Sequence, residues 1–186
     1  MSPADHAIFV QAHDAADHGN WTAARALAAQ SSNTLGMDLI TWRYVASDSS
    51  GATFEEIDQF LRTHTKWPRR DLILANAERA MSRSMDPRAV IAWFGGKTPQ
   101  TGLGEIRLGE AMVATGNKNG NTRIRRGWVD GTFMAADETQ ILAAHGDVIT
   151  SSDHRARLER LLWANDRDAA RREMTRCDAE GQQLAN

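Results

Sequence analysis

The residues of this chain that could do chemistry are carboxylates, histidines, arginines and tryptophans in recognisable groups. The adjacent carboxylates Glu55-Glu56 and Asp137-Glu138 have the residue type that general acid–base catalysis needs. Neighbouring residues on a helix point about 100° apart, however, and both pairs stand at expected helix starts, where the helix dipole favours negative charge. We therefore interpret both pairs as helix-capping groups and expect no catalytic residue in this chain.

The histidines and the single cysteine do not follow a metal-binding pattern. His6, His13 and Asp17 could share a helix face, but they lack the compact i, i+4 histidine pair with a third ligand that zinc sites use. Cys177 has no partner at metal-ligand spacing. We expect no metal and no cofactor, and we interpret these two histidines as surface residues.

Groups of arginines are the candidates for a binding surface. Six of them could contact a glycan or a protein partner: Arg123, Arg125, Arg126, Arg155, Arg157 and Arg160. Interspersed acids such as Glu159 and Asp168 also fit solvated helix faces with local ion pairs, so both interpretations stay open. The formal net charge is −2 and neither half of the chain is strongly basic, which argues against nucleic acid as a partner.

The six tryptophans offer a choice between ligand binding and core packing. Five of them lie 25, 26, 35 and 35 residues apart: Trp42, Trp67, Trp93, Trp128 and Trp163. Aromatic faces line many sugar-binding grooves, but large aromatic residues buried between stacked helices would give the same spacing. We favour core packing for these five and for Trp21. We accordingly expect Leu161→Ala and Trp163→Ala each to cost about 2–5 kcal/mol of stability.

Capping residues and apolar periodicity divide the chain into eleven expected helices. Their expected bounds are Pro3–His18, Trp21–Gln30, Met37–Ser47, Phe54–His64, Pro68–Arg83, Pro87–Phe94, Gly102–Thr115, Thr122–Phe133, Glu138–His145, Asp153–Ala164 and Arg167–Asp178. Thr53 and Glu56 are spaced as a capping box. Expected N-caps are Asp86, Thr101, Asp137, Ser152 and Asp166, and glycines expected in left-handed helix ends are Gly19, Gly95, Gly116 and Gly146.

The spacing of these helices predicts the fold class. Expected helix pairs begin near Phe54, Pro87, Thr122 and Asp153, at intervals of 33, 35 and 31 residues, close to the roughly 34-residue tetratricopeptide repeat. We predict an all-α, right-handed superhelix (a solenoid) of stacked helix pairs, with a single closed bundle as the alternative. One domain would span residues 1–186, with N-terminal helices in 1–50 and the helix-pair array in 54–178. No apolar run is long enough to cross a bilayer.

A series of short motifs follows one order between Phe60 and Arg172. They are His64-Thr65-Lys66-Trp67-Pro68, Ala77-Glu78, Trp93-Phe94, Pro99-Gln100-Thr101-Gly102, Gly116, Arg126-Gly127-Trp128, Glu138, His145-Gly146, Asp153-His154 and Arg157-Leu158-Glu159-Arg160-Leu161-Leu162-Trp163. Together they resemble the N-terminal superhelical (U-type) domain of soluble lytic murein transglycosylases, particularly the alphaproteobacterial ones. Gly120-Asn121 departs from the alanine-rich helix that relatives favour at that place.

The resemblance implies a periplasmic protein that acts on peptidoglycan. In that family a separate C-terminal lysozyme-like domain cleaves the MurNAc–GlcNAc bond with one glutamate, and the superhelical region is a non-catalytic platform. We expect that catalytic domain to be absent from this chain, because no Glu-Ser followed by the family's Gly-Leu-Met-Gln motif occurs.

The resemblance thus implies a scaffold whose partners would be peptidoglycan strands or other cell-wall proteins. A stand-alone helical-repeat adaptor that binds a peptide or protein partner is the alternative from a different functional class. An all-helical enzyme of another type is the third and least favoured interpretation, because the sequence offers no catalytic set.

Overall fold

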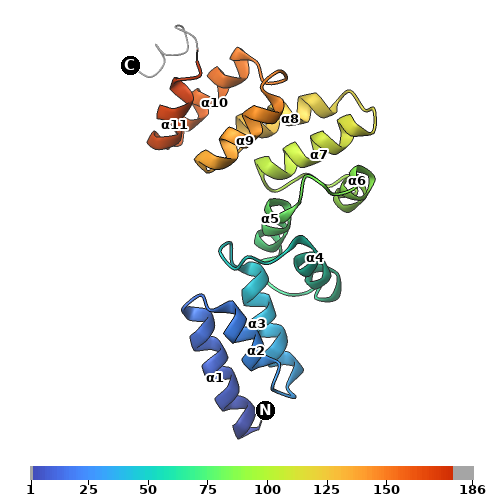
Figure 1. Ribbon diagram of the computed structural model, residues 1–186, viewed down its shortest axis with the longest axis vertical. Coiled ribbons are helices and arrows are strands. Elements are labelled where there is room, and N and C mark those ends of the chain that lie inside the picture. The colour runs from blue at the N-terminus through green and yellow to red at the C-terminus, as the bar shows by residue number, and fades with distance from the viewer. Residues whose placement is uncertain (1, 178–186) are drawn as a thin grey trace. The chain divides into compact units, whose positions relative to one another are not determined.

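The computed structural model describes residues 2–177, and in this range the chain is all-helical, with eleven helices and no strand (Figure 1). The all-α prediction is confirmed. The described helices belong to two compact units that divide after Ala80. The first unit contains α1 (Pro3–Asp17), α2 (Trp21–Ala28), α3 (Thr34–Ala46), α4 (Phe54–Thr63) and α5 (Arg70–Ala80). The second contains α6 (Pro87–Phe94), α7 (Gly102–Ala114), α8 (Gly120–Asp130), α9 (Ala135–His145), α10 (Ser151–Trp163) and α11 (Arg167–Met174).

Capping residues account for most helix starts. The Thr53–Glu56 capping box is confirmed: the Thr53 hydroxyl accepts from the Glu56 N–H and the Glu56 carboxylate accepts from the Thr53 N–H. The expected N-caps Asp86, Thr101 and Asp166 are also confirmed. Two expected N-caps, Asp137 and Ser152, are wrong because their helices begin earlier, α9 at Ala135 and α10 after the N-cap Thr150.

Three of the four glycines expected in left-handed helix ends have that conformation. Gly95 has the left-handed conformation expected of it (φ 54°), and Gly19 and Gly116 also have positive φ. Gly146 stays right-handed (φ −60°), so the left-handed prediction is wrong there. The residue Asp178 of the last expected helix lies outside the described residues.

The helix starts repeat along the chain more regularly than the sequence predicted. Helices α2, α4, α6, α8 and α10 begin at Trp21, Phe54, Pro87, Gly120 and Ser151, at intervals of 33, 33, 33 and 31 residues. Within each unit the main contacts join helices that follow one another, and the pairs α1–α3, α3–α5 and α8–α10 also touch. Contacts between helices one and two places apart are what stacked helix pairs require.

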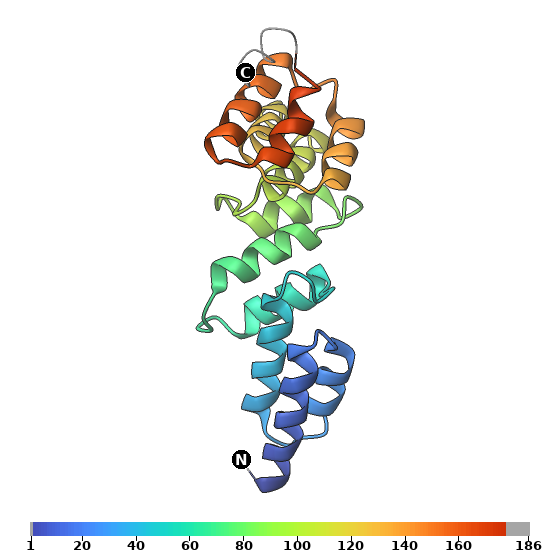
Figure 2. The ribbon, with the colours of Figure 1, turned by 90° about the vertical axis from the view of Figure 1, so that its left-hand side faces the viewer.

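Small residues allow the first three helices to pack closely. Figure 2 shows α1, α2 and α3 side by side in blue to cyan. Their core consists of two large residues and four alanines: Phe9, Ile40, Ala12, Ala16, Ala24 and Ala28. In the second unit one core cluster joins α7, α8 and α9 through Ile106, Trp128, Phe133, Ile141 and Ile149, and another joins α10 and α11 through Leu158, Leu161, Ala169, Ala170 and Cys177.

Glycines set the distance between α7 and α8. A β-carbon on Gly109 would lie 2.7 Å from the carbonyl oxygen of Gly120, and one on Gly127 would lie 2.7 Å from the carbonyl oxygen of Gly102. Both distances are below 3.0 Å, a separation that real β-carbon contacts essentially never show. The two helices therefore touch backbone to backbone at both ends of their contact. This explains why α8 tolerates glycines that lower its helix propensity by about 1 kcal/mol each relative to alanine.

The tryptophans divide between core and surface. Trp128 is fully buried, whereas Trp21, Trp42, Trp67 and Trp93 are partly buried. Trp163 is 85% exposed, so its assignment to the core is wrong. The reason is geometric: α10 packs through Leu158 and Leu161, and a residue two places beyond Leu161 points about 200° away around the helix.

We expect this difference to appear in stability measurements. Leu161 is 1% exposed, so Leu161→Ala should lower the free energy of unfolding by about 2–5 kcal/mol through lost burial and a residual cavity. Trp163→Ala should change it by no more than about 0.5 kcal/mol. Urea unfolding of the two variants in parallel provides the measurement, and equal shifts of their midpoints would contradict the structural assignment.

No helix in residues 2–177 has the length and apolar character needed to cross a membrane.

Candidate functional site

The structure places most of the six candidate arginines in contacts within the second unit. Three on α8 form ion pairs with carboxylates: Arg123 with Glu105 (2.8 Å), Arg125 with Asp153 (2.7 Å) and Arg126 with Asp130 (3.5 Å). On α10, Arg155 is partly exposed, and Arg160 donates to the carbonyl oxygens of Val129 (2.7 Å) and Gly131 (2.6 Å). These arginines do not converge on one free surface, and Arg126, whose side chain is 63% exposed, is the most accessible of the three on α8.

Arg157 belongs to the interior of the second unit and not to its surface. Its side chain has no exposed area, and it donates to the carbonyl oxygens of Trp128 (2.6 Å) and Gly131 (2.7 Å). The guanidinium also lies over the rings of Trp128 (4.4 Å) and Phe133 (5.0 Å). Its inclusion in a glycan or partner surface is therefore corrected, because no ligand could reach it.

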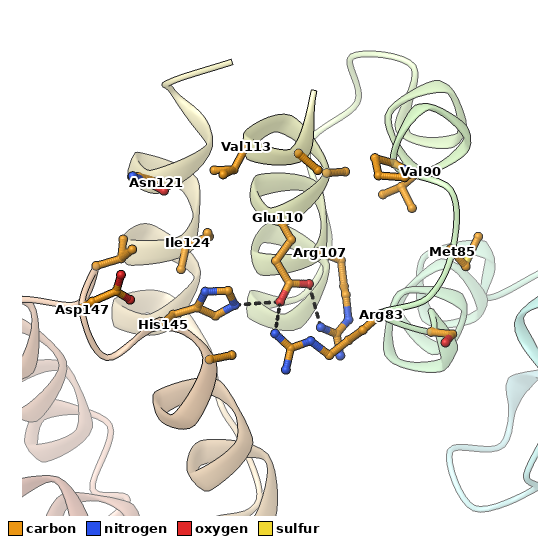
Figure 3. Close-up of a pocket in the computed structure, with 16 residues that line it drawn as sticks. Arg83, Met85, Val90, Arg107, Glu110, Val113, Asn121, Ile124, His145 and Asp147 are labelled. Carbon is orange, nitrogen blue, oxygen red and sulfur yellow. Dashed lines mark hydrogen bonds and ion pairs between the residues drawn. The ribbon is translucent and has the colours of Figure 1, made fainter. Parts of the chain in front are cut away.

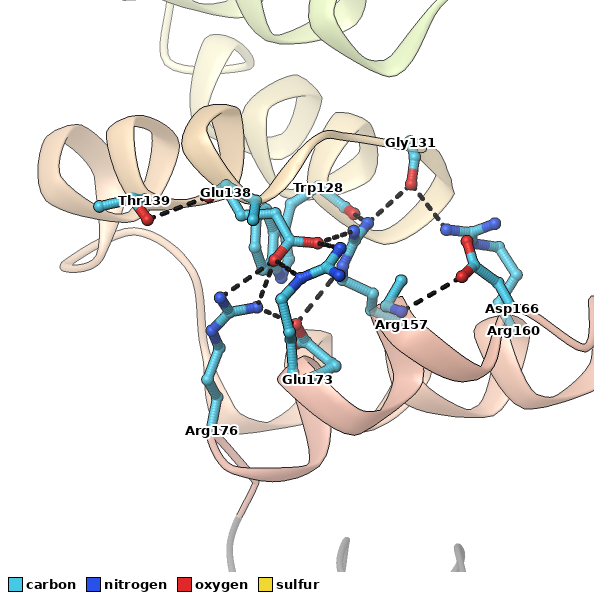
Figure 4. A network of polar contacts seen from close by, with 12 residues as sticks. Trp128, Gly131, Glu138, Thr139, Arg157, Arg160, Asp166, Glu173 and Arg176 are labelled. Atoms are coloured by element: carbon cyan, nitrogen blue, oxygen red, sulfur yellow. Dashed lines mark hydrogen bonds and ion pairs between the residues drawn. The ribbon is translucent and has the colours of Figure 1, made fainter.

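Two fully buried glutamates surround Arg157 (Figure 4). Glu138 of α9 accepts from Arg157 (3.1 Å), and Glu173 of α11 lies 3.5 Å from the Arg157 Nε. Arg172 of α11 and Arg176, which follows α11, also donate to Glu138, and Arg176 donates to Glu173. We call these five residues the Arg157 network, which ties α8, α9, α10 and α11 together.

The electrostatics of the Arg157 network indicate a structural role. Burial raises the pKa of Glu138, but hydrogen bonds and charges from Arg172 and Arg176 outweigh it, so that the pKa lies below its usual value. Burial lowers the pKa of Arg157, against which the charges of Glu173 and Glu138 act. Glu138 is thus held ionised and sealed from solvent, which excludes it as a proton donor to a substrate.

A groove in the same unit is open to solvent and lined by both charged and apolar residues (Figure 3). It has a volume of about 540 Å³ and lies over α7, between α6 with its preceding loop on one side and α8 with the end of α9 on the other. We call it the Glu110 groove, because Glu110 of α7 lies at its centre (Figure 3). The volume is within the range of roughly 300–1,000 Å³ that small-molecule sites occupy.

Glu110 draws three basic side chains together from different elements. Its Oε1 lies 2.7 Å from His145 Nε2 and 2.9 Å from Arg83 Nη2, and its Oε2 accepts from Arg107 Nη1 at 2.8 Å. Burial raises the pKa of Glu110, but the hydrogen bonds from His145 and Arg107 and the charges of Arg107 and Arg83 lower it to about 2. Glu110 is therefore ionised at neutral pH and serves to hold the three basic groups in place.

We expect acid to weaken the second unit through Glu110. Its pKa is lowered from 4.5 to about 2 in the fold, so its stabilisation is complete above about pH 5 and is lost as pH falls towards 2. The measurement is the thermal midpoint between about pH 7 and pH 2.5, compared with Glu110→Gln. Below about pH 5 the thermal midpoint of the unaltered protein should fall more steeply with decreasing pH than that of Glu110→Gln. The same pH dependence in both proteins would contradict the prediction.

Sequence reasoning missed the Glu110 groove. Arg83, Arg107, Glu110 and His145 come from a loop and two helices, and Glu110 and His145 are 35 residues apart. His145 belonged to one of the family-like motifs, but no spacing rule joined it to Glu110. The one available signal was the repeat length, because residues about one repeat apart occupy similar places on successive helix pairs.

The chain was also compared with known proteins. It matches no family model, no curated protein and no solved structure. What the Glu110 groove and the arginines can do is therefore inferred from their own geometry and charge.

Proposed function

We propose that this chain is the non-catalytic helical scaffold of a periplasmic lytic transglycosylase, a segment that holds peptidoglycan or another cell-wall protein while a separate domain cleaves the MurNAc–GlcNAc bond. The observation that carries this proposal is the role of the motif residues in the second unit. Trp128, Glu138 and Arg157 are motif residues, and all three have no exposed area. Gly127 is another, and it forms the backbone contact between α7 and α8.

The chemistry of the buried and half-buried carboxylates supports a scaffold role. Glu110 and Glu138 are each surrounded by basic side chains, His145 and two arginines around Glu110 and arginines around Glu138, which lower their pKa values, so both are ionised at neutral pH. A catalytic acid in glycoside cleavage needs the opposite arrangement, with a raised pKa and access to the glycosidic oxygen. These two glutamates therefore position helices and basic side chains and do not supply protons.

The proposal is tested with purified peptidoglycan sacculi. The full chain should sediment with the sacculi and should release no 1,6-anhydro-muropeptides, as measured by mass spectrometry of the soluble fraction. A lytic enzyme added to a parallel sample provides the positive control for release. Release by this chain alone, or absence of the chain from the sacculus pellet, would overturn the proposal.

A matched pair of variants locates the binding surface. Arg126→Gln removes an arginine that is 63% exposed and paired with Asp130 one turn away. Arg62→Gln removes an arginine of the first unit that is 73% exposed and paired with Asp58 one turn away. If the arginines of α8 contact the anionic glycan, only Arg126→Gln should lower the sedimented fraction. Equal losses for both variants would assign binding to overall charge.

A further inference from the structure

We propose that the Glu110 groove binds a short peptide segment whose carboxylate lies next to an apolar side chain. This inference goes beyond the scaffold role and does not depend on it. The chemistry rests on three features of the groove: arginine donors that Glu110 leaves free, an apolar lining, and charges of opposite sign on its two walls.

The arginines of the groove have more hydrogen-bond donors than Glu110 uses. Arg83 is 45% exposed and contacts Glu110 through Nη2, while a guanidinium carries five N–H donors. Arg107 donates through Nη1, and its Nε is buried without a hydrogen-bond partner. Because guanidinium groups bind carboxylates with two parallel hydrogen bonds, the free edge of Arg83 is the place for a ligand carboxylate. Glu110 fixes the orientation of both arginines before the ligand arrives.

The rest of the lining is mainly apolar. Besides the arginines, apolar side chains from five elements line the groove. They are Met85 in the loop before α6, Val90 in α6, Val113 in α7, Ile124 in α8 and Val148 in the loop after α9. In Figure 3, Val90 and Val113 lie at the opposite end of Glu110 from Arg83 and Arg107. A ligand whose carboxylate meets Arg83 would therefore place an adjoining apolar group against these side chains. Inorganic anions have no group to place there.

The charges of the groove favour a peptide over a polyanion. The charges of Arg83 and Arg107 are balanced by those of Glu110 and Asp147, so these four side chains together carry no net charge. Arg83 and Asp147 lie on opposite sides of the groove (Figure 3). One wall thus matches a carboxylate and the other matches an N–H donor, and the amide of Asn121, on the same side of the groove as Asp147, can bond a peptide group (Figure 3). A peptide end carries both a carboxylate and N–H donors, whereas a phosphate chain meets repulsion from Asp147.

The test is an NMR titration of the full chain with the tripeptide Ac-Ala-Ala-Val, used with a free carboxylate and as its C-terminal amide. The free acid should shift signals from α6, α7, α8 and the end of α9, and it should bind at least about tenfold more tightly than the amide. Arg83→Gln should remove this difference. Arg88→Gln, which replaces an exposed arginine of α6 outside the groove, should leave it unchanged.

Several results would overturn the proposal. They are equal affinity for acid and amide, no saturable shift with the acid, shifts outside these helices, binding of inorganic phosphate as tight as that of the acid, or equal losses in Arg83→Gln and Arg88→Gln. If Arg83→Gln does not fold, the acid–amide comparison on the unaltered protein decides the question by itself. The titration does not involve sacculi, so the scaffold proposal and this one can fail separately.

Discussion

Replacement of Arg157 by alanine is expected to lower the free energy of unfolding by about 3–5 kcal/mol, because it removes a fully buried arginine from between two fully buried glutamates. The loss has three physical parts. Glu138 and Glu173 lose the cation between them, the carbonyl oxygens of Trp128 and Gly131 lose their buried donor, and the rings above the guanidinium face an empty space. In each case a buried group loses the partner that Arg157 provides.

The measurement is thermal or urea unfolding followed by far-UV circular dichroism, with two comparison variants. Arg126→Ala removes an exposed arginine from a one-turn ion pair, and it should change stability by less than about 0.5 kcal/mol. Arg157→Lys keeps the charge but loses the planar fork that reaches two carbonyls and a carboxylate at once, so its stability should lie between the other two. A midpoint for Arg157→Ala equal to that of Arg126→Ala would contradict a structural role for the network.

The double substitution Gly109→Ala and Gly127→Ala is expected to destabilise the chain by about 2–6 kcal/mol, although alanine is the better helix former at both positions. A β-carbon added at Gly109 would meet Ile124 as well as the Gly120 carbonyl, and one added at Gly127 would meet Ile106 as well as the Gly102 carbonyl. Because the atoms in the way are mostly backbone, α7 and α8 would have to move apart and would lose packing along their whole length.

The sign of the effect makes this prediction decisive. Helix propensity alone predicts that each substitution stabilises the protein by about 1 kcal/mol, whereas overpacking predicts a loss of roughly 1–3 kcal/mol per site. Urea unfolding of both single variants and the double variant separates the two. Thr122→Ala, at an exposed position of α8, provides the control in which propensity acts alone. Unchanged or increased stability of the double variant would refute the close backbone contact.

The Arg157 network and the Glu110 groove use the same residue types for different purposes. In the network, Arg157 and both glutamates have no exposed area, and the contacts join four helices. In the groove, Arg83 is 45% exposed and keeps donors for another molecule. The difference lies in access and not in composition. For this reason we propose a structural role for the network and a ligand-binding role for the groove.

The helices and the spacing of the helix pairs could be predicted from the sequence because they depend on interactions between residues close together in the chain. The Thr53–Glu56 capping box, and Asp86 followed by Pro87, act through contacts within three residues, so they could be read directly from the sequence. The all-α class and the repeat of about 33 residues followed from such signals. The exact start of α9 did not, because its N-cap Met134 makes no side-chain capping bond that a pattern could predict.

Only the tertiary structure decided which residues of the same type are buried and which are exposed. Arg126 and Arg157 both lie on arginine-rich helices, and the hydrogen-bond partners of Arg157 are 19 to 29 residues away along the chain. Trp128 and Trp163 likewise continue the same spacing, yet one is buried and the other is 85% exposed. Local patterns fix which residues share a helix face, but burial depends on which neighbouring helix covers that face. The Glu110 groove has the same origin, because it exists only where α6, α7, α8 and the end of α9 meet.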